Sequence, residues 1–279
     1  MSIRIIADSA ANVFSLADVD FDHVPLKIVT TQAEYVDDPQ LDVEQMVDEI
    51  QKTKGRSGTS CPNVHEWLEA FRGAARVFAV TITSNLSGSY AAAAQAARDY
   101  EEENPEAQVC VIDTLSAGPE MRLIAERLRE RVMAGDSFET IKDSIKSYLS
   151  HTHLLFSLES LTNLARNGRC SPALAKIAGV LGIRLVGAAS DHGTLEPLHK
   201  CRGEKKAIET IFHEMKERGF AGGKVRIAHC FNLEAATKLK EMILSAYAGS
   251  DIQVEPCTGL CSFYAERGGM LIGYEDGLA

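Results

Sequence analysis

The stretch Val77-Phe78-Ala79-Val80-Thr81-Ile82-Thr83-Ser84-Asn85-Leu86-Ser87-Gly88-Ser89-Tyr90 decides the fold class of this chain. It begins with apolar and β-branched residues, which is typical of a strand buried on both faces. The segment 91–97 is rich in alanine and has no glycine or proline, which predicts a helix. The hydroxyls and single glycine between them predict a loop that seats an anion, because backbone N–H groups at a helix start are free. The alternative is that Ser87 or Ser89 only caps the helix.

The composition describes a globular protein without nucleic acid as its main partner. Of 279 residues, 45% are hydrophobic and 24% are charged, enough for one large or two ordinary domains with real cores. The net charge of −10 argues against nucleic-acid binding, which needs a clustered positive surface. No apolar run approaches the length of a membrane span, so no stable membrane insertion is expected. Asp8 interrupts the first apolar segment too early for a signal peptide, and seven scattered cysteines fit a reducing compartment. We therefore expect a cytoplasmic protein.

The first half of the chain alternates between predicted strands and predicted helices. Strands are expected at 3–7, 24–29, 77–82 and 109–114, and helices at 41–50, 64–72, 91–97, 119–133 and 137–149. The segment 53–63 is the most loop-like part. Alternation of this kind predicts parallel βαβ units. Asp8, at the end of the first strand, either contacts a ligand or holds the neighbouring loop, and we favour the second role. We assign residues 1–152 to an N-terminal α/β domain with a parallel sheet.

From residue 153 onward the pattern predicts a mixed sheet. Strands are expected at 154–158, 182–189, 195–200, 224–229, 252–257 and 270–274, and helices at 161–164, 172–180, 204–218 and 233–246. Asp191-His192-Gly193 is typical of a hairpin turn. Hairpin-like pairs among helices predict an α+β domain over residues 153–279. The expected fold class is therefore α/β with two domains.

A search for catalytic motifs finds no complete set. A Gly-x-Gly-x-x-Gly fingerprint and a Gly-x-Ser-x-Gly elbow are both absent, and 219–224 resembles a phosphate-binding loop only superficially. A serine nucleophile needs a nearby base, for which His65, His192 and His229 are candidates without a predicted position. Cys61 and His65 lack a nearby third ligand, so no metal site is predicted. No catalytic residue is assigned, although a serine-dependent acyl hydrolase and a small-molecule kinase remain the alternatives from the enzyme class.

A constellation of short motifs runs almost from end to end of the chain: Asp8-Ser9, Thr59-Ser60-Cys61-Pro62-Asn63, Ile82–Tyr90, 113–118, Asn167-Gly168-Arg169-Cys170-Ser171, Asp191-His192-Gly193 and Arg202-Gly203. Their order and spacing resemble those of the bacterial DegV proteins, which bind fatty acids. That family favours Thr-Ser-Gln-Pro-Ser in the second segment and Gly-Gly-Arg-Ile-Ser in the fifth.

The resemblance implies two α/β domains with one long-chain fatty acid buried between them. The carboxylate would lie against Thr59, the Ser87 hydroxyl and the Gly88 backbone N–H. Some members of the family present the acid to a separate fatty acid kinase for phospholipid synthesis, which makes them carriers without catalysis or cofactor. On this resemblance the expected ligand-binding residues are Thr59, Ser60, Ser87, Gly88, Arg169, Glu266 and Arg267.

One segment departs from the family pattern. The family usually ends with Gly-x-His-x-Gly-Pro-Gly, whose histidine also contacts the carboxylate, whereas this chain aligns Glu266 at that position. A second carboxylate beside the ligand would repel it unless one is protonated or a cation intervenes. Three alternatives are open: Arg267 or Tyr264 supplies the missing donor, Glu266 points elsewhere, or the ligand's head group is not a carboxylate. Acyl binding should survive in any case, because a tail of sixteen or so carbons offers about 12 kcal/mol before ordering costs, against about 1.5–3 kcal/mol for one charged hydrogen bond.

Overall fold

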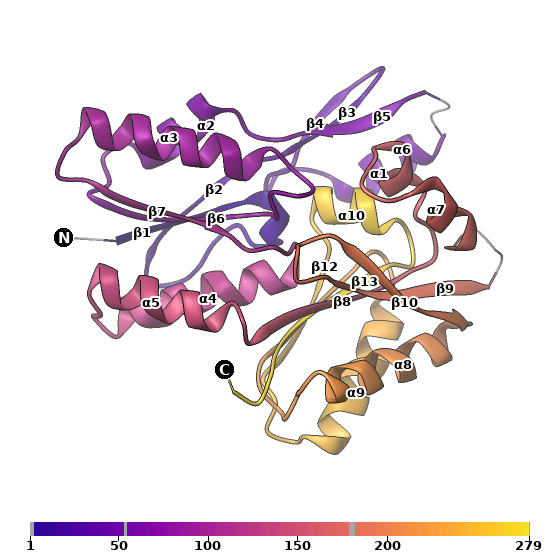
Figure 1. Ribbon diagram of the computed structural model, residues 1–279. Helices are drawn as coiled ribbons and strands as arrows, with labels where there is room; N and C mark the ends of the chain where they lie inside the picture. The colour runs from indigo at the N-terminus through magenta and orange to yellow at the C-terminus, as the bar shows by residue number, and fades with distance from the viewer. Residues whose placement is uncertain (1–2, 53–54, 179–181, 279) are drawn as a thin grey trace.

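A four-stranded parallel sheet organises the first half of the chain in the computed structural model, which describes residues 3–52, 55–178 and 182–278 (Figure 1). Its strands, in spatial order, are β2 (Asp20–Val24), β1 (Ile3–Asp8), β6 (Arg76–Thr81) and β7 (Gln108–Asp113). Each neighbouring pair is parallel, with Ile5 opposite both Phe21 and Phe78. The predicted parallel arrangement is therefore confirmed. A short 3₁₀ helix, η1 (Ser9–Ala11), follows β1.

Helices cover both faces of this sheet. Figure 1 shows α2 (Val64–Phe71) and α3 (Ser89–Glu103) on one face, and α4 (Pro119–Met133) and α5 (Phe138–Tyr148) on the other. The alanines of α3 permit close approach to the fully buried Trp67 and Phe71. On the opposite face Phe78 stacks on Phe138 with ring centroids 4.5 Å apart. Successive residues of β6 thus enter different cores, as expected for a strand buried on both sides.

A small antiparallel sheet was only partly foreseen from the sequence. The expected strand 24–29 is divided, because Pro25 has no N–H to donate and separates β2 from β3 (Lys27–Thr30). β3 pairs with β4 (Glu34–Val36) and with β5 (Ser57–Ser60), which lies inside the segment predicted as a loop. The loop prediction was wrong there, and residues 53–54 of that segment lie outside the described residues. Helix α1 (Val43–Lys52) forms close to its expected position.

A six-stranded mixed sheet organises the second half. Its spatial order is β10 (Leu195–Arg202), β9 (Ile183–Ala189), β8 (Thr152–Leu158), β13 (Met270–Glu275), β11 (Val225–His229) and β12 (Ile252–Pro256). Only the β11–β12 pair is parallel. The mixed sheet and the β9–β10 hairpin are therefore confirmed. The domain division at residue 152 stays a prediction, and it falls at the first residue of β8.

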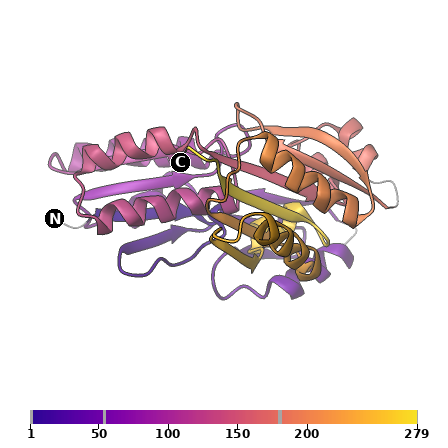
Figure 2. The ribbon, with the colours of Figure 1, turned by 90° about the horizontal axis from the view of Figure 1, so that it is seen from below.

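Different helices cover the two faces of the mixed sheet. One face packs against α8 (Glu204–Glu217) and α9 (Leu233–Ala246), which bury Ile211 and Leu239. The other face meets α6 (Thr162–Arg166), α7 (Pro172–Ala178), α10 (Gly259–Ala265) and part of α4. Residues 179–180 of the predicted helix 172–180 lie outside the described residues. Helix α10 was not predicted. Seen from below, the four-stranded sheet with α4 and α5 lies to the left, and most of the C-terminal half lies to the right together with α1 of the N-terminal half (Figure 2).

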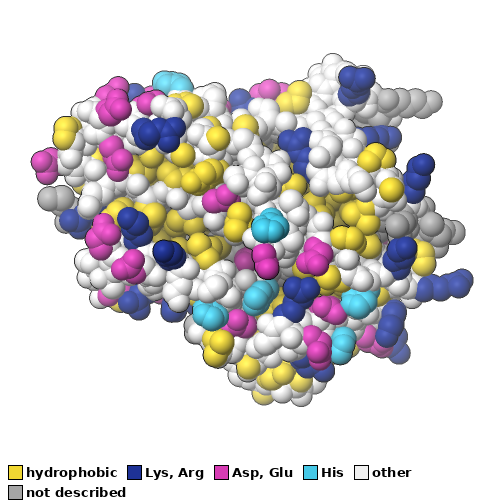
Figure 3. Space-filling view, viewed as in Figure 1, with side chains coloured by type: hydrophobic (Ala, Val, Ile, Leu, Met, Phe, Trp, Pro, Cys, Tyr) yellow, Lys and Arg dark blue, Asp and Glu magenta, His cyan; other side chains and the backbone are white. Residues whose placement is uncertain are grey.

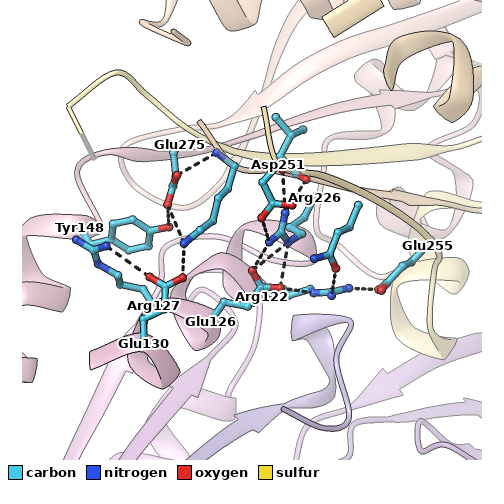
Figure 4. A network of polar contacts seen from close by, with 12 residues as sticks. Arg122, Glu126, Arg127, Glu130, Tyr148, Arg226, Asp251, Glu255 and Glu275 are labelled. Atoms are coloured by element: carbon cyan, nitrogen blue, oxygen red, sulfur yellow. Dashed lines mark hydrogen bonds and ion pairs between the residues drawn. The ribbon is translucent and has the colours of Figure 1, made fainter. Parts of the chain in front are cut away.

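An ion-pair network joins the two halves through α4 (Figure 4). The Glu126 carboxylate contacts Arg122 at 2.8 Å on its own helix and Arg226 of β11 at 2.7 Å. Arg226 also pairs with Asp251 at 2.8 Å, and Arg122 reaches Glu255 of β12. A second group beside it contains Arg127, Glu130, Tyr148, Lys224 and Glu275. Residues far apart in the sequence are thereby tied together on one side of the molecule.

Two surface properties bear on the classes of partner. In Figure 3, acidic side chains are spread over the face shown, and the basic side chains form no continuous patch on it. This agrees with the net charge of −10. Among the described residues, no helix combines the length and apolar character needed to cross a membrane.

Candidate functional site

An apolar cavity of about 350 Å³ lies between the two large sheets. Its walls come from β5, from the loops after β6 and β7, from β8 and β9, and from α10. The loops leave the carboxyl ends of parallel strands, where open α/β sheets place their ligand contacts. Most of the lining is aliphatic or aromatic, including Leu26, Leu86, Leu154, Phe156, Leu195 and Leu271. Such a lining suits a ligand that is largely hydrocarbon.

Phe156 shapes the apolar wall because its neighbour on β9 is a glycine. Gly187 lies opposite Phe156 in the β8–β9 register. A Cβ at position 187 would lie 2.4 Å from the Phe156 Cζ and 2.5 Å from the Glu196 carbonyl oxygen. Contacts this short do not occur between unbonded carbon atoms, so only glycine lets the ring lie flat against β9. The space above the ring is then left to the cavity.

Polar groups gather at one end of the cavity. The Thr59 Oγ1 and the Tyr264 hydroxyl lie 2.7 Å apart, and both residues line the cavity. Gly88 lies beside Cys61, whose Sγ would be 3.1 Å from a Cβ at position 88. The Arg169 guanidinium reaches the same loop and donates from Nε to the Leu86 carbonyl oxygen at 3.1 Å. Hydroxyls, a helix start and one cation thus converge on a single region.

A buried aspartate holds the loop after β6 in place. One oxygen of Asp8 accepts hydrogen bonds from the Ile82 backbone N–H at 2.9 Å and from the Ser89 hydroxyl at 2.7 Å. These contacts clamp the two ends of the loop that carries Ser87 and Gly88. Asp8 does not line the cavity, which confirms the favoured role of holding the loop. Burial raises the pKa of its carboxyl to about 7.

A second buried aspartate positions α10. Asp37, just after β4, accepts hydrogen bonds from the backbone N–H groups of Gly259 at 2.6 Å and Leu260 at 3.0 Å. Both groups belong to the first turn of the helix, where a carboxylate is favourable. Burial raises the pKa of Asp37 to about 6. The contact fixes the helix that carries Tyr264 against the N-terminal half of the chain.

A buried glutamate supports the third loop. Glu120, in the first turn of α4, accepts hydrogen bonds from Ser116, which lines the cavity, and from the Thr152 hydroxyl at 2.9 Å. Burial raises the pKa of this carboxyl to about 7. Asp8, Asp37 and Glu120 therefore act behind the cavity wall, each fixing one segment that faces the ligand space.

Five of the seven residues expected from the sequence to bind ligand line the cavity: Thr59, Ser60, Ser87, Gly88 and Arg169. Among them, Ser60 lies at the exposed rim. The other two, Glu266 and Arg267, do not line the cavity. The Glu266 carboxylate accepts a hydrogen bond from the Asn163 backbone N–H at 2.9 Å, in the first turn of α6. Arg267 pairs with Asp48 of α1, and its guanidinium carbon lies 4.3 Å from the Phe231 ring centroid.

Glu266 and Arg267 were expected to contact the ligand, but neither lines the cavity. Glu266 points elsewhere, which was one of the three open alternatives, because its carboxylate satisfies a helix start. Tyr264, one of the residues considered as a replacement donor, does line the cavity. Cys61 also lines it and was not expected to do so. Cys61 belongs to the motif 59–63, but only Thr59 and Ser60 of that motif were expected to bind the ligand.

Among the described residues that line the cavity, Ser87 has no histidine beside it. The Ser87 hydroxyl accepts a hydrogen bond from the Ser89 N–H at 3.2 Å. No histidine lines the cavity in the part of the chain that the structure describes. Of the three candidate bases, His65 and His192 are exposed, and the His229 Nδ1 accepts from the Asn232 N–H. The described residues also contain no group of three or more histidine, cysteine or carboxylate ligands placed for a metal ion.

Comparison with known proteins assigns the family. The family model described as "Uncharacterised protein, DegV family" matches residues 2–276. A DegV domain-containing protein of Streptococcus pneumoniae is 41% identical over 279 residues and covers 99% of both chains.

Two solved structures are similar over the same length. A DegV family protein from Eubacterium eligens, loaded with heptadecanoic acid, is 46% identical with a TM-score of 0.97 and covers 99% of this chain and 100% of its own. The fatty acid kinase (Fak) B3 protein of Streptococcus pneumoniae, loaded with linoleic acid, is 41% identical with a TM-score of 0.97 and the same coverage. The family model and these identities, over a fold with an apolar cavity between its two large sheets, show that this chain belongs to the DegV family.

Proposed function

We propose that the protein binds one long-chain fatty acid inside the bacterial cell, with the acyl chain in the cavity and the carboxylate against Thr59, Ser87 and Gly88. The observation that carries this proposal is the distribution of polar groups around a mostly apolar cavity. The Thr59, Ser87 and Tyr264 hydroxyls, the start of α3 and Arg169 line one region of it, and the rest of the lining is apolar apart from Ser60, Thr83, Ser116 and Thr194. An amphiphile with one polar end matches that distribution, and a charged head is favoured at a helix N-terminus. The related proteins loaded with heptadecanoic and linoleic acid support it.

We further propose that the protein is a carrier that presents the carboxylate to a separate fatty acid kinase. A second depression, of about 350 Å³, lies on the outer side of the loop and shares Ser87, Gly88 and Arg169 with the cavity. A carboxylate at this place would be separated from solvent by one loop only. The absence of a base beside Ser87 among the described residues favours a carrier over a hydrolase. The description of one relative as a fatty acid kinase B3 protein supports the same role.

The first experiment identifies the ligand. The protein is purified from its expression host, weighed by native mass spectrometry, denatured, and its lipid extract analysed. We expect one fatty acid released per chain. A protein that is empty and takes up no added palmitic acid would overturn the fatty acid proposal.

The second experiment separates a carrier from an enzyme. Loaded protein is incubated with ATP alone, and with ATP and a purified bacterial fatty acid kinase, and acyl phosphate is trapped with hydroxylamine. The proposal expects acyl hydroxamate only when the kinase is present. Hydroxamate formed with ATP alone, or release of fatty acid from an added acyl ester, would instead establish an enzyme.

A further inference from the structure

Tyr264 and Thr59 form a hydroxyl pair that joins the two halves of the chain at the polar end of the cavity. Tyr264 comes from α10 and Thr59 from β5, and their oxygens lie 2.7 Å apart. The Tyr264 ring packs edge-on against Phe263, with centroids 4.9 Å apart, and Phe263 is fully buried. The ring is therefore held in place while its hydroxyl faces the ligand space.

The Thr59 and Tyr264 hydroxyls have two protons between them, and their mutual hydrogen bond uses one. Each hydroxyl has one proton and can accept as well as donate. One proton occupies the hydrogen bond between the two oxygens, whichever residue donates it. Among the described residues, neither hydroxyl has another hydrogen-bond partner. One donor thus remains available at the cavity wall, and a ligand oxygen there would receive it.

Tyr264 keeps its proton at neutral pH. Burial raises the pKa of Tyr264 above its usual range, against smaller lowering effects from Thr59 and Arg169. Tyr264 and Arg169 line the same cavity. A protonated phenol beside a cation is a good partner for a carboxylate, because charge-assisted hydrogen bonds are stronger than neutral ones.

The charged residues nearby have other partners. Glu266 accepts from the first turn of α6, and Arg267 pairs with Asp48. Arg169 lines the cavity, but two of its nitrogens donate to the carbonyl oxygens of Leu86 and Asn167. Recognition of the head group by the C-terminal half therefore falls to the Tyr264 phenol and to the Nη2 group of Arg169, which has no hydrogen bond among the described residues.

We propose that Tyr264 is a positioning residue for the ligand: its hydroxyl pair with Thr59 donates a hydrogen bond to the fatty acid carboxylate and fixes its direction toward the outer loop. This inference rests on the proposed function. It assigns to α10 a direct contact with the head group, so that the carboxylate is held from both halves of the chain at once.

The test compares an acid with an alcohol of the same chain length. Delipidated wild-type, Tyr264→Phe and Tyr247→Phe proteins are titrated with palmitic acid and with hexadecanol. Tyr247 is the matched control, because its ring packs against Phe220 and it does not line the cavity. We expect Tyr264→Phe to weaken palmitic acid binding about tenfold to a hundredfold, and hexadecanol binding less than about tenfold, since hydrogen bonds to charged groups contribute more.

A spectroscopic readout accompanies the titration. Palmitic acid labelled with carbon-13 at the carboxyl should give a bound signal in wild type that moves in Tyr264→Phe and stays in place in Tyr247→Phe. An equal loss of acid and alcohol affinity with an unmoved signal would overturn the inference, because the hydroxyl would then only brace Thr59. Unchanged affinities would overturn it as well. A wild-type protein that takes up no fatty acid would overturn the proposed function and this inference together, and so is distinguishable from failure of the inference alone.

Discussion

Replacing Arg226 by methionine should lower the free energy of unfolding by about 3 kcal/mol, the low end of the range for breaking a buried ion pair. The Arg226 side chain is 4% exposed and pairs with Glu126 at 2.7 Å and with Asp251 at 2.8 Å (Figure 4). Its guanidinium also donates to the carbonyl oxygens of Val225 and Asp251. Methionine keeps the aliphatic volume and removes the charge with all of these bonds.

The contacts that remain set the size of the effect. Removing one partner of a buried pair costs about 3–5 kcal/mol when the other charge is left buried and alone. Here Glu126 keeps Arg122 at 2.8 Å, and Asp251 is 54% exposed and returns to water. Because neither carboxylate is left buried and unpaired, the loss of unfolding free energy should lie at the low end of this range, about 3 kcal/mol. With an unfolding entropy of about 2.1 cal/mol/K per residue, the melting temperature of a 279-residue chain should fall by about 5 °C.

Urea unfolding followed by two probes measures the change. Fluorescence of Trp67, the only tryptophan, reports on the N-terminal half, and far-ultraviolet circular dichroism reports on the whole chain. The control is Lys238→Met, which removes an exposed pair with Glu234 on one face of α9 and should leave the midpoint unchanged. If Arg226→Met unfolded at the wild-type midpoint by both probes, the network would contribute no net stability and our reasoning would be wrong.

Three further changes test the site and its supports. Ser87→Ala should weaken palmitic acid binding about tenfold in a titration, because it removes one hydrogen bond to a charged group; an unchanged affinity would exclude Ser87 from the head-group contacts. Gly187→Ala should lower the free energy of unfolding by about 2 kcal/mol in urea, because the added Cβ would lie 2.4 Å from Phe156; a wild-type midpoint would contradict this. Burial raises the pKa of Asp8 and of Glu120 to about 7, so the folded state retains protons that the unfolded state has already lost. Stability should therefore fall as pH rises from about 4.5 to about 7, by about 1.4 kcal/mol per pH unit for each carboxyl, and level off above pH 7. Asp8→Asn should remove the contribution of Asp8, and greater stability at pH 8 than at pH 5.5 would refute the reasoning.

Long regular elements could be predicted from the sequence, and short ones that depend on tertiary pairing could not. Helices α4 and α9 were expected with the bounds they have, because proline at the start of α4 and amphipathic periodicity are local signals. Strand β5 reads Ser57-Gly58-Thr59-Ser60, a composition of turns, and forms because β3 offers it an antiparallel partner. Helix α10 has seven residues and depends on Asp37, which lies 222 positions earlier than Gly259.

The site shows the same division between local and distant causes. The loop with Ser87 and Gly88 follows directly from a buried strand and a helix start, so its place beside the cavity could be expected. The direction of the Glu266 side chain could not, because it is decided by the Asn163 N–H, 103 positions away in the chain. A motif aligned by sequence predicts where a residue lies along the backbone; the free hydrogen-bonding groups around it decide where its side chain points.

The cavity between the two sheets also has a consequence for the lifetime of the protein. Apolar side chains that line a cavity make fewer dispersion contacts than side chains in a close-packed interior. An acyl chain bound there would supply those contacts and so stabilise the folded protein. With free fatty acid at about a hundred times its dissociation constant, the loaded form would gain about 2.7 kcal/mol over the empty one. A difference of that size changes how often a chain opens to proteases. Fatty acid supply would then regulate not only what the protein carries but how much of the protein the cell keeps.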